Sequence, residues 1–518
     1  MQNPQAVIEI GSTGIRLLVA EIVTTKDSEN NSTQKKRNIL DRSEVPLGIG
    51  RDVFTKGSIS RETLLSCLRI LNRFGEQLST WGISRQETTV IGTSAVRSAN
   101  NRDPFVDRIK IKTGFTVRVI DGIEENRLMY VAVRECLKDK NLLLEEKNSI
   151  ILEITGASTE IMLIEKGHMV GAHSLRLGTI LIDEKIRTAS GSNQDLRQYV
   201  EEYIQNTKIS LKTEINLHDV YQFIALGGDL KVAALFTGRA ISPFLWQIDR
   251  KDFENLVEEV QRYTLEECIA HFKLSQNDAQ TFQISLLAYQ KFVALTNVKS
   301  ILVPDTSLRE GVILSQMSGD NPALSKEFNE QIVTSACTLL KKYQGDEKHA
   351  FYVAKLSLMI YDCMKDEMDA SPHTRLLLEV SAILHDIGML IRAKDHNLHS
   401  KYIIENSEIF GLTKDDLKIV ASIAKFHRSA LQPQEDAEVH LMARSDRMCI
   451  LKLSAILRIS DALDRSHQQK FQNITFKIEK DTLTIRTNSH SALNLEQLAV
   501  QEKGDLFENV FGYKILLL

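Results

Sequence analysis

Two short segments of the chain place a carboxylate just before a run of small residues. The carboxylates are Glu9 and Glu153, and the small residues that follow are Gly11, Ser12 and Thr13, then Gly156, Ser158 and Thr159. Backbone N–H groups and hydroxyls of small residues can surround a phosphate closely. A carboxylate beside such a turn can hold a cation, directly or through water. The pattern predicts two phosphate-binding loops with metal ligands; two ordinary hairpins are the alternative.

The two segments are copies of one pattern. IEIGSTGIRLLVAE (8–21) aligns with LEITGASTEIMLIE (152–165) at an offset of 144, so that Arg16 meets Glu160. Each copy is typical of a strand, a turn of small residues and a second strand. The repeat therefore predicts two related lobes whose turns face each other across a cleft and grip a phosphate chain with its Mg²⁺.

The second half of the chain places imidazole and carboxylate groups on apolar helix faces. His349 lies in line with Val353, Leu356 and Ile360, and similar stripes carry the remaining groups, which are His385, Asp386 and Asp461. Buried groups of this kind are costly unless they are paired or bind a metal. Imidazole with carboxylate suits Mn²⁺ or another divalent transition metal that activates water. The alternative is that each histidine is an ordinary core residue whose ring nitrogens are hydrogen-bonded and bind no metal.

The elements that must position these residues change in type along the chain. Residues 1–310 alternate short β-like runs with amphipathic stretches, which indicates an α/β fold, and a polar insert (24–38) is typical of a hairpin tip. From about residue 322 the pattern is almost wholly helical, until alternation returns after residue 470. The expected domains are an N-terminal lobe, a second lobe, a helical domain and a small α+β segment, over 1–124, 125–320, 321–469 and 470–518.

Composition excludes several classes of protein. A net charge of −4 over 518 residues argues against a globally basic nucleic-acid binder, so we expect no nucleic acid as partner. No stretch of 18 apolar residues predicts a membrane span, and the start of the chain has no signal-peptide pattern. Six scattered cysteines without a CxxC pair favour the reducing cytoplasm.

Several stretches, in order, resemble the exopolyphosphatase / guanosine pentaphosphate phosphatase family. They are IEIGSTGIRLLV (8–19), GTSAVRSANNRDPF (92–105), IDGIEENRLMY (120–130), LEITGASTEI (152–161), SLRLGT (174–179), LGG (226–228) and SLREG (307–311). The resemblance implies duplicated actin–hexokinase–Hsp70-like (ribonuclease H-like) lobes and a homodimer. It implies an exopolyphosphatase that releases terminal phosphate from inorganic polyphosphate. The alternatives are hydrolysis of guanosine pentaphosphate, or regulatory phosphate or nucleotide binding with weak turnover. The expected partner is accordingly inorganic polyphosphate or guanosine penta- or tetraphosphate.

The resemblance also implies roles for individual residues. A glutamate of the family's G-x-E-E motif activates the attacking water, so the base here is Glu124 or Glu125, with Glu124 preferred. Glu160 matches a catalytic or metal-binding carboxylate, and Arg97 matches an arginine that contacts phosphate. Further phosphate contacts are expected from Arg16, Gly227 and Gly228, and Mg²⁺ is expected at Glu9, Glu153 and Glu160.

The chain departs from the family pattern in both loops. Glu9 and Glu153 stand where the family usually has aspartate, which moves each carboxylate by roughly 1.5 Å. Thr155 and Ala157 replace two loop glycines, so a side chain would be strained there if the backbone had a positive φ. Weak or altered activity is therefore an alternative to full activity.

The helical half resembles the HD phosphohydrolase superfamily, through His349, His385-Asp386 and Asp461 in that order. Long members of the exopolyphosphatase family are similar at ILHDIG (383–388), HSKYII (399–404), KFHR (425–428) and LRISDALDRSH (457–467). The resemblance implies an HD-type metal site, with His399 and His427 as further ligands. Both catalysis and regulatory binding of a nucleotide or phosphate are possible roles for that site. The other histidines, His373, His396 and His440, are predicted to be surface residues.

Overall fold

The structure is a computed structural model that describes residues 4–26, 33–138, 142, 144–188, 193–212, 215–318, 322–428, 432–471, 473–487 and 493–518. The chain divides into two compact units, Met1–Ser325 and Lys326–Leu518. The domain boundary that we expected near residue 320, and the tip of the polar insert, lie outside the described residues. Of the helices that are described, none is both long and apolar enough to cross a membrane.

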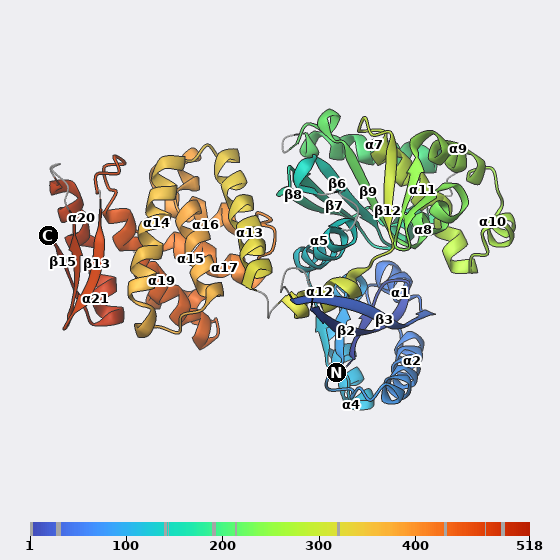
Figure 1. The fold of residues 1–518 in the computed structure, drawn as a ribbon, viewed down its shortest axis with the longest axis horizontal. Coiled ribbons are helices and arrows are strands. Elements are labelled where there is room, and N and C mark those ends of the chain that lie inside the picture. The colour runs from blue at the N-terminus through green and yellow to red at the C-terminus, as the bar shows by residue number, and fades with distance from the viewer. Residues whose placement is uncertain are drawn as a thin grey trace. The chain divides into compact units, whose positions relative to one another are not determined.

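The first lobe is the blue part of the chain in Figure 1. Its sheet has the strand order β3-β2-β1-β4-β5. Strands β1, β2 and β3 form antiparallel hairpins, whereas β4 and β5 join in parallel. Apolar residues of α2 and α4, among them Phe74 and Phe105, pack against this sheet to form its core. The strand bounds are Gln5–Ile10 (β1), Gly14–Lys26 (β2), Thr33–Pro46 (β3), Thr89–Gly92 (β4) and Val117–Val119 (β5), and the helices are Ile49–Lys56 (α1), Arg61–Thr80 (α2), Ser94–Ser98 (α3) and Arg102–Thr113 (α4).

The second lobe repeats this strand order and adds an antiparallel extension. Its sheet runs β10-β11-β12-β9-β6-β7-β8, in which β8-β7-β6-β9-β12 corresponds to β3-β2-β1-β4-β5. The strands are Ser149–Ile154 (β6), Thr159–Glu165 (β7), His168–Leu175 (β8), Gln222–Leu226 (β9), Arg239–Ser242 (β10), Leu245–Asp249 (β11) and Ser300–Pro304 (β12). The helices are Gly122–Lys138 (α5), Thr179–Thr188 (α6), Asn193–Leu211 (α7), Gly228–Thr237 (α8), Arg250–Val260 (α9), Leu265–Phe272 (α10) and Gln276–Val293 (α11). The helix that follows β12, Leu308–Ser318 (α12), packs against α5 and against β1 and β2 of the first lobe. The expected boundary at residue 124 falls within α5.

Strand register confirms the repeat at an offset of 144. Glu9 pairs with Arg16 across the first hairpin, and Glu153 pairs with Glu160 across the second. The Gly11 N–H donates to the Gly14 carbonyl at 3.0 Å, and the equivalent bond, from Thr155 to Ser158, is 2.8 Å long. The sequence copies are therefore copies of one backbone structure.

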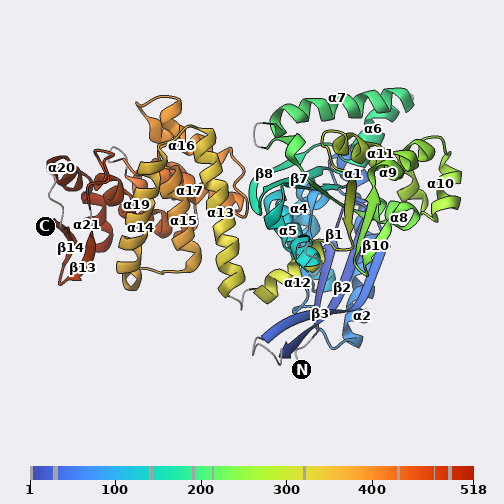
Figure 2. The same ribbon diagram turned by 45° about the horizontal axis from the view of Figure 1, so that its top comes forward.

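The second unit contains a helical part and a small mixed part (Figure 2). The helices that form the helical part are Pro322–Lys342 (α13), whose first residues belong to the first unit, Glu347–Cys363 (α14), Pro372–Leu384 (α15), His396–Glu405 (α16), Lys414–Lys425 (α17), Ala437–His440 (α18) and Arg444–Ala462 (α19). The chain ends in a three-stranded sheet and two helices, which are Thr475–Glu479 (β13), Thr482–Arg486 (β14), Asn494–Lys503 (α20), Asp505–Phe511 (α21) and Lys514–Leu517 (β15).

The start of α6 holds the second loop in place. The N–H groups of Thr179 and Ile180 each donate at 3.0 Å to loop carbonyls, those of Thr155 and Gly156. A Cβ on Gly178 would lie 2.2 Å from the Ala157 carbonyl carbon, so only glycine allows this close approach. Neither Thr155 nor Ala157 has a positive φ, so the strain that their side chains could have caused is absent.

We therefore expect Gly178→Ala to displace the second loop. Overpacking of this kind costs about 1–3 kcal/mol of unfolding free energy, and thermal unfolding measures it. Gly48→Ala is the matched control, because a Cβ there comes no closer than 4.0 Å to another group. Equal melting temperatures for the two variants would show that the loop does not depend on Gly178.

Candidate active site

The two repeated turns face each other. A Cβ on Gly156 would lie 3.5 Å from the Cβ of Ser12, and the Ser12 hydroxyl shares a 3.2 Å hydrogen bond with Ser94. Each turn is also bonded to the helix that follows its lobe's third strand, since the Gly50 N–H donates to the Ser12 carbonyl at 2.8 Å. The predicted small residues of both lobes thus come together at one place.

Gly227 and Gly228 lie beside the second turn. Strand β9 pairs in parallel with β6, so that Leu226 is next to Glu153, and α8 begins directly after it at Gly228. The Tyr289 hydroxyl donates to the Leu226 carbonyl and accepts from the Ile154 N–H at 2.8 Å, which ties the two strand ends together. Gly227 has a φ of 115°, a conformation that favours glycine. The predicted Gly-Gly pair is therefore at the site.

The first lobe contributes a carboxylate held by arginines. Arg16 Nη1 lies 3.3 Å from Glu9 Oε1, and Arg309 Nε lies 3.4 Å from Glu9 Oε2. Burial opposes the charge of Arg16, but Glu9 and Glu44 outweigh it and raise the pKa of the guanidinium. Arg16 Nη2 also donates to Thr13 Oγ1 at 2.9 Å, so the arginine fixes the turn itself.

The second lobe contributes two carboxylates, Glu153 and Glu160, for which the part of the chain that the structure describes shows no ion pair with an arginine. Glu160 accepts hydrogen bonds from Ser174 Oγ at 2.7 Å, from Ser158 Oγ at 2.8 Å and from Asn126 Nδ2 at 3.4 Å. Burial raises the pKa of Glu160 although these bonds oppose it. Burial, together with the charges of Glu9 and Glu160, raises the pKa of Glu153 to about 7.

Helix α5 adds Glu125 to this group of carboxylates. Arg97 Nη1 donates to Glu125 Oε1 at 2.5 Å and also to the Ile120 carbonyl at 2.6 Å. Burial raises the pKa of Glu125 to about 8; Arg97 opposes the rise, and Glu160 and Glu153 add to it. Glu125 therefore belongs electrostatically to the same site as the two carboxylates of the second hairpin.

Glu124, which the sequence analysis preferred, has other partners. Arg118 Nη1 donates to both of its oxygens, at 2.6 and 2.7 Å, and Arg127 Nη2 lies 3.7 Å away. The Glu124 N–H donates to Asp121 Oδ1 at 2.8 Å. Its carboxylate therefore lies with Arg118 and Arg127, whereas Glu125, which also pairs with an arginine, interacts with Glu153 and Glu160.

The oxygen donors of the site suit Mg²⁺ in their chemistry, but the glutamates do not form one of the described groups whose potential ligand atoms all lie within 4.8 Å of one another. Glu9, Glu125, Glu153 and Glu160 offer only oxygen atoms, which hard divalent cations prefer. Burial, and after it the neighbouring carboxylates, raise the pKa values of Glu125 and Glu153, and a divalent cation placed beside them would favour their charged forms. Arg309, Ser174 and Asn126 also contact these carboxylates; each lies within a stretch that carries the family resemblance, but its residue type alone does not mark it as part of the site.

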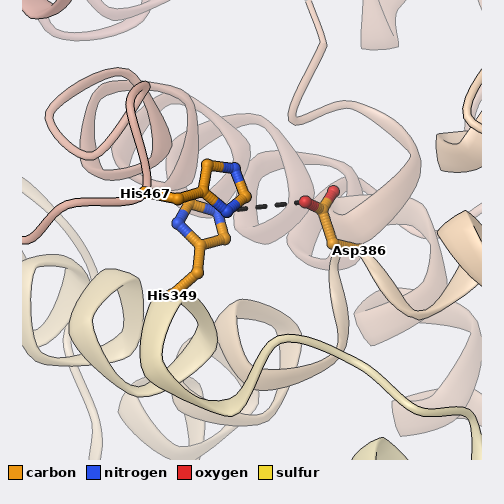
Figure 3. A group of neighbouring side chains, drawn as sticks. All are labelled: His349, Asp386 and His467. Carbon is orange, nitrogen blue, oxygen red and sulfur yellow. Dashed lines mark ion pairs between the residues drawn. The ribbon is translucent and has the colours of Figure 1, made fainter.

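The second unit gathers the predicted imidazole and carboxylate groups. His349 comes from α14, His385 and Asp386 follow α15, and Asp461 comes from α19. The Nε2 atoms of His349 and His385 lie 3.5 and 3.8 Å from Asp461 Oδ1. Figure 3 shows His349 facing Asp386, while His467, which the sequence analysis did not single out, stacks on His349 with ring centroids 3.7 Å apart.

The prediction that His396 is a surface residue is wrong. Its side chain is 12% exposed, and its Nε2 lies 3.0 Å from Asp386 Oδ1 and 3.1 Å from His427 Nε2. His427 lies in this group as expected, whereas His399 belongs to none of the described groups of potential metal ligands. His396 is the first residue of α16, where the local turn rather than the apolar stripe sets the direction of the side chain.

Two lobes with this repeated strand order define the actin-like ATPase type of α/β fold. Residues 30–319 match the model of the Ppx/GppA phosphatase family, and residues 333–504 match that of Ppx/GppA phosphatase, domain III. The chain belongs to the Ppx/GppA phosphatase family.

Individual relatives agree with this membership. A guanosine-5'-triphosphate,3'-diphosphate pyrophosphatase of Pseudoalteromonas translucida is 24% identical over 83% of this chain and 82% of its own length. The protein of that name from Vibrio parahaemolyticus is 24% identical over 93% and 91%. The crystal structure of an exopolyphosphatase from Cytophaga hutchinsonii, 23% identical, covers 61% of this chain and 98% of its own with a TM-score of 0.53, and supports the fold.

The raised pKa of Glu125 predicts a pH dependence of stability in metal-free protein. A carboxyl whose folded pKa is about 8, against about 4.3 when unfolded, stabilises the fold fully below pH 4. The stabilisation declines as the pH rises to 8, by up to about 1.4 kcal/mol per pH unit for one proton. Glu125→Gln should remove this decline, so that its melting temperature exceeds that of the parent at pH 8.5 in the presence of a chelator.

Glu124→Gln is the control for this measurement. Its carboxylate is paired with Arg118, and the variant should keep the parental slope between pH 5 and pH 8.5. Parallel melting curves for Glu125→Gln and the parent would contradict the electrostatic description of the site.

Proposed function

We propose that the first unit is an exopolyphosphatase-type phosphohydrolase that releases the terminal phosphate of inorganic polyphosphate. The observation that carries the proposal is the largely buried Glu125, which is paired with Arg97 and lies among the carboxylates of the second hairpin. In the reaction, water attacks the terminal phosphorus, the bond to the bridging oxygen breaks, and Glu125 accepts the proton of the water. A base whose pKa lies near the working pH is suited to this transfer.

The surrounding residues have distinct tasks in this mechanism. Phosphoryl transfer depends chiefly on alignment and on neutralisation of charge. Arg97 orients the base, and the N–H groups and hydroxyls of the turns at Ser12 and Ser158 bind phosphate oxygens. Mg²⁺, held by Glu9, Glu153 and Glu160, would neutralise charge on the phosphates when bound.

Guanosine pentaphosphate is the second candidate substrate. The observation that favours it is the name of the curated relatives, guanosine-5'-triphosphate,3'-diphosphate pyrophosphatase, which match most of this chain. Both substrates end in a phosphoric anhydride, so the same base and turns would serve either. Regulatory binding of phosphate or nucleotide with weak turnover is the other alternative, because Glu9 and Glu153 stand where the family usually has aspartate.

We further propose an HD-type fold for the helical part of the second unit, and a cytoplasmic location. The order and gathering of His349, His385, Asp386 and Asp461 support the first proposal. Six cysteines, all of them free in the structure, support the second, because disulfides are rare in reducing compartments. The homodimer stays a prediction of the family resemblance, which light scattering on the purified protein would test.

Glu125→Gln should lower phosphate release from long-chain polyphosphate about 10²–10⁴-fold, the range for loss of a positioned base. Glu124→Gln, which removes a neighbouring carboxylate of the same helix, should retain most of the parental rate. Steady-state phosphate release at saturating Mg²⁺ measures both. Equal losses in the two variants, or full activity of Glu125→Gln, would overturn the assignment of the base.

Substrate profiling tests the choice between the anhydrides. Initial rates on polyphosphate and on guanosine pentaphosphate should both depend on Mg²⁺ and should both fall in Glu125→Gln. The ratio of kcat/KM identifies the preferred substrate. Tight binding of either compound with no turnover, in Mg²⁺ or in Mn²⁺, would establish the regulatory alternative instead.

A further inference from the structure

We propose that Arg309 is a positioning residue for the Ser12 turn, which consists of Gly11, Ser12 and Thr13. Arg309 holds the carboxylate of Glu9 and offsets its charge, and so allows the turn to accept a phosphate anion. The inference rests on the proposed function, because phosphate is the ligand which that function assigns to the turn.

Arg309 comes from a helix that crosses from one lobe to the other. Helix α12 follows β12 as α5 follows β5, so the two helices are equivalent in the repeat. Helix α5 packs against β7 and β8 of the second lobe, α12 packs against β1 and β2 of the first, and the two helices contact each other (Figure 1). The start of α5 thus brings Glu125 to the carboxylates of the second lobe, and the start of α12 brings Arg309 to that of the first.

Close packing fixes α12 against α5. A Cβ on Gly311 would lie 2.1 Å from the Leu128 carbonyl oxygen, so only glycine allows this approach of the two helices. Arg127 Nη1 of α5 also donates to Ser315 Oγ of α12 at 3.1 Å. Arg309 is therefore on a helix whose position is fixed relative to the helix that carries the proposed base.

The side chain of Arg309 lies beside Glu9. Its Nε is 3.4 Å from Glu9 Oε2, its Nη1 donates to the Leu17 carbonyl at 3.5 Å, and the two side chains are 13% and 12% exposed. The Nε atom is buried and has no hydrogen-bond partner among the described residues, so the pair is held chiefly by charge. Each oxygen of Glu9 thus faces one guanidinium, that of Arg16 at Oε1 and that of Arg309 at Oε2.

Arg16 alone does not offset the charge of Glu9, because it is shared with a second carboxylate. Its Nε donates to Glu44 Oε1 at 2.7 Å, a shorter contact than the 3.3 Å between its Nη1 and Glu9. With Arg309 present, two guanidinium groups face two carboxylates. Without Arg309, one negative charge would remain. The second residue of α12 is Arg309 whereas the second residue of α5 is Ile123, so the two lobes differ in charge here too.

This uncompensated charge would lie directly against the Ser12 turn. A Cβ on Gly11 would be 3.3 Å from Glu9 Oε1, so the carboxylate is in contact with the backbone that is expected to bind phosphate. Like charges a few ångströms apart repel each other strongly where water is largely excluded. The contacts of Arg309 are with Glu9 and Leu17, outside the turn, so Arg309 reduces this repulsion without occupying the place of the phosphate.

Binding of tripolyphosphate to the full-length, chelator-treated protein tests the inference by isothermal titration calorimetry. Arg309→Met should raise the Kd about tenfold, the effect of one lost charge interaction at short range. Glu9→Gln combined with Arg309→Met should return the Kd to about the parental value, since neither charge then remains. A merely structural role of Arg309 does not predict this recovery on removal of a second side chain.

Gln316→Ala is the matched control on the same helix. Gln316 Nε2 donates to Thr89 Oγ1 at 2.9 Å and so links α12 to the first lobe at an exposed place. The variant removes a polar contact of α12 without changing the charge beside Glu9, and it should bind tripolyphosphate with the parental Kd.

Each result distinguishes this inference from the alternatives. A parental Kd for Arg309→Met, or a double variant that binds as weakly as Arg309→Met, would overturn it. If circular dichroism shows that Arg309→Met does not fold, the double variant decides, because it leaves neither charge of the pair buried alone, and weak binding by the folded double variant would overturn the inference.

Hydrolysis separates this inference from the proposed function. A parent that hydrolyses polyphosphate with Mg²⁺ but does not bind tripolyphosphate without metal would overturn the role of Arg309 alone. A parent that binds tripolyphosphate with the expected pattern of Kd values but hydrolyses neither substrate would overturn the proposed function and support the role of Arg309.

Discussion

The structure of the first unit depends on holding carboxylates close together away from water. Burial of a charged group is costly unless opposite charges or hydrogen bonds offset the cost. Glu9 is offset by Arg16 and Arg309, and Glu160 by hydroxyl and amide donors, yet burial still raises the pKa of Glu125 and Glu153. Strand register, turn hydrogen bonds and the start of α6 all fix backbone at this point, so the fold maintains an arrangement that its own charges oppose.

Much of this arrangement was predictable because it depends on local pattern. The offset of 144 residues between copies of one strand–turn–strand motif is visible in the sequence, and strand register confirms it. The apolar stripe of α14 likewise predicted that His349 would be buried. In both cases a periodicity of two or of 3.6 residues determines which side chains share a face.

What was not predictable depends on single turns and on distant partners. Glu124 and Glu125 are adjacent residues of the same type, so the sequence pattern does not distinguish them. Their ion pairs do, since Arg118 binds Glu124 and Arg97 binds Glu125, the one that faces the other carboxylates. His396 and His399 are separated by one helical turn, and the bond from His396 to the Ala393 carbonyl decides between them. Lys503 reaches Asp461 from a part of the chain whose sequence carries no sign of this contact.

The duplication in the first unit is symmetrical in its backbone and asymmetrical in its charge. At equivalent positions of the two hairpins, Glu9 faces an arginine and Glu153 faces a glutamate. The two hairpins therefore have the same backbone structure but carry opposite charges at this position, so the electrostatic potential differs between the two turns. An elongated anion bound between the turns would therefore have one preferred orientation, because Arg16 and Glu160 carry opposite charges at equivalent positions of the repeat.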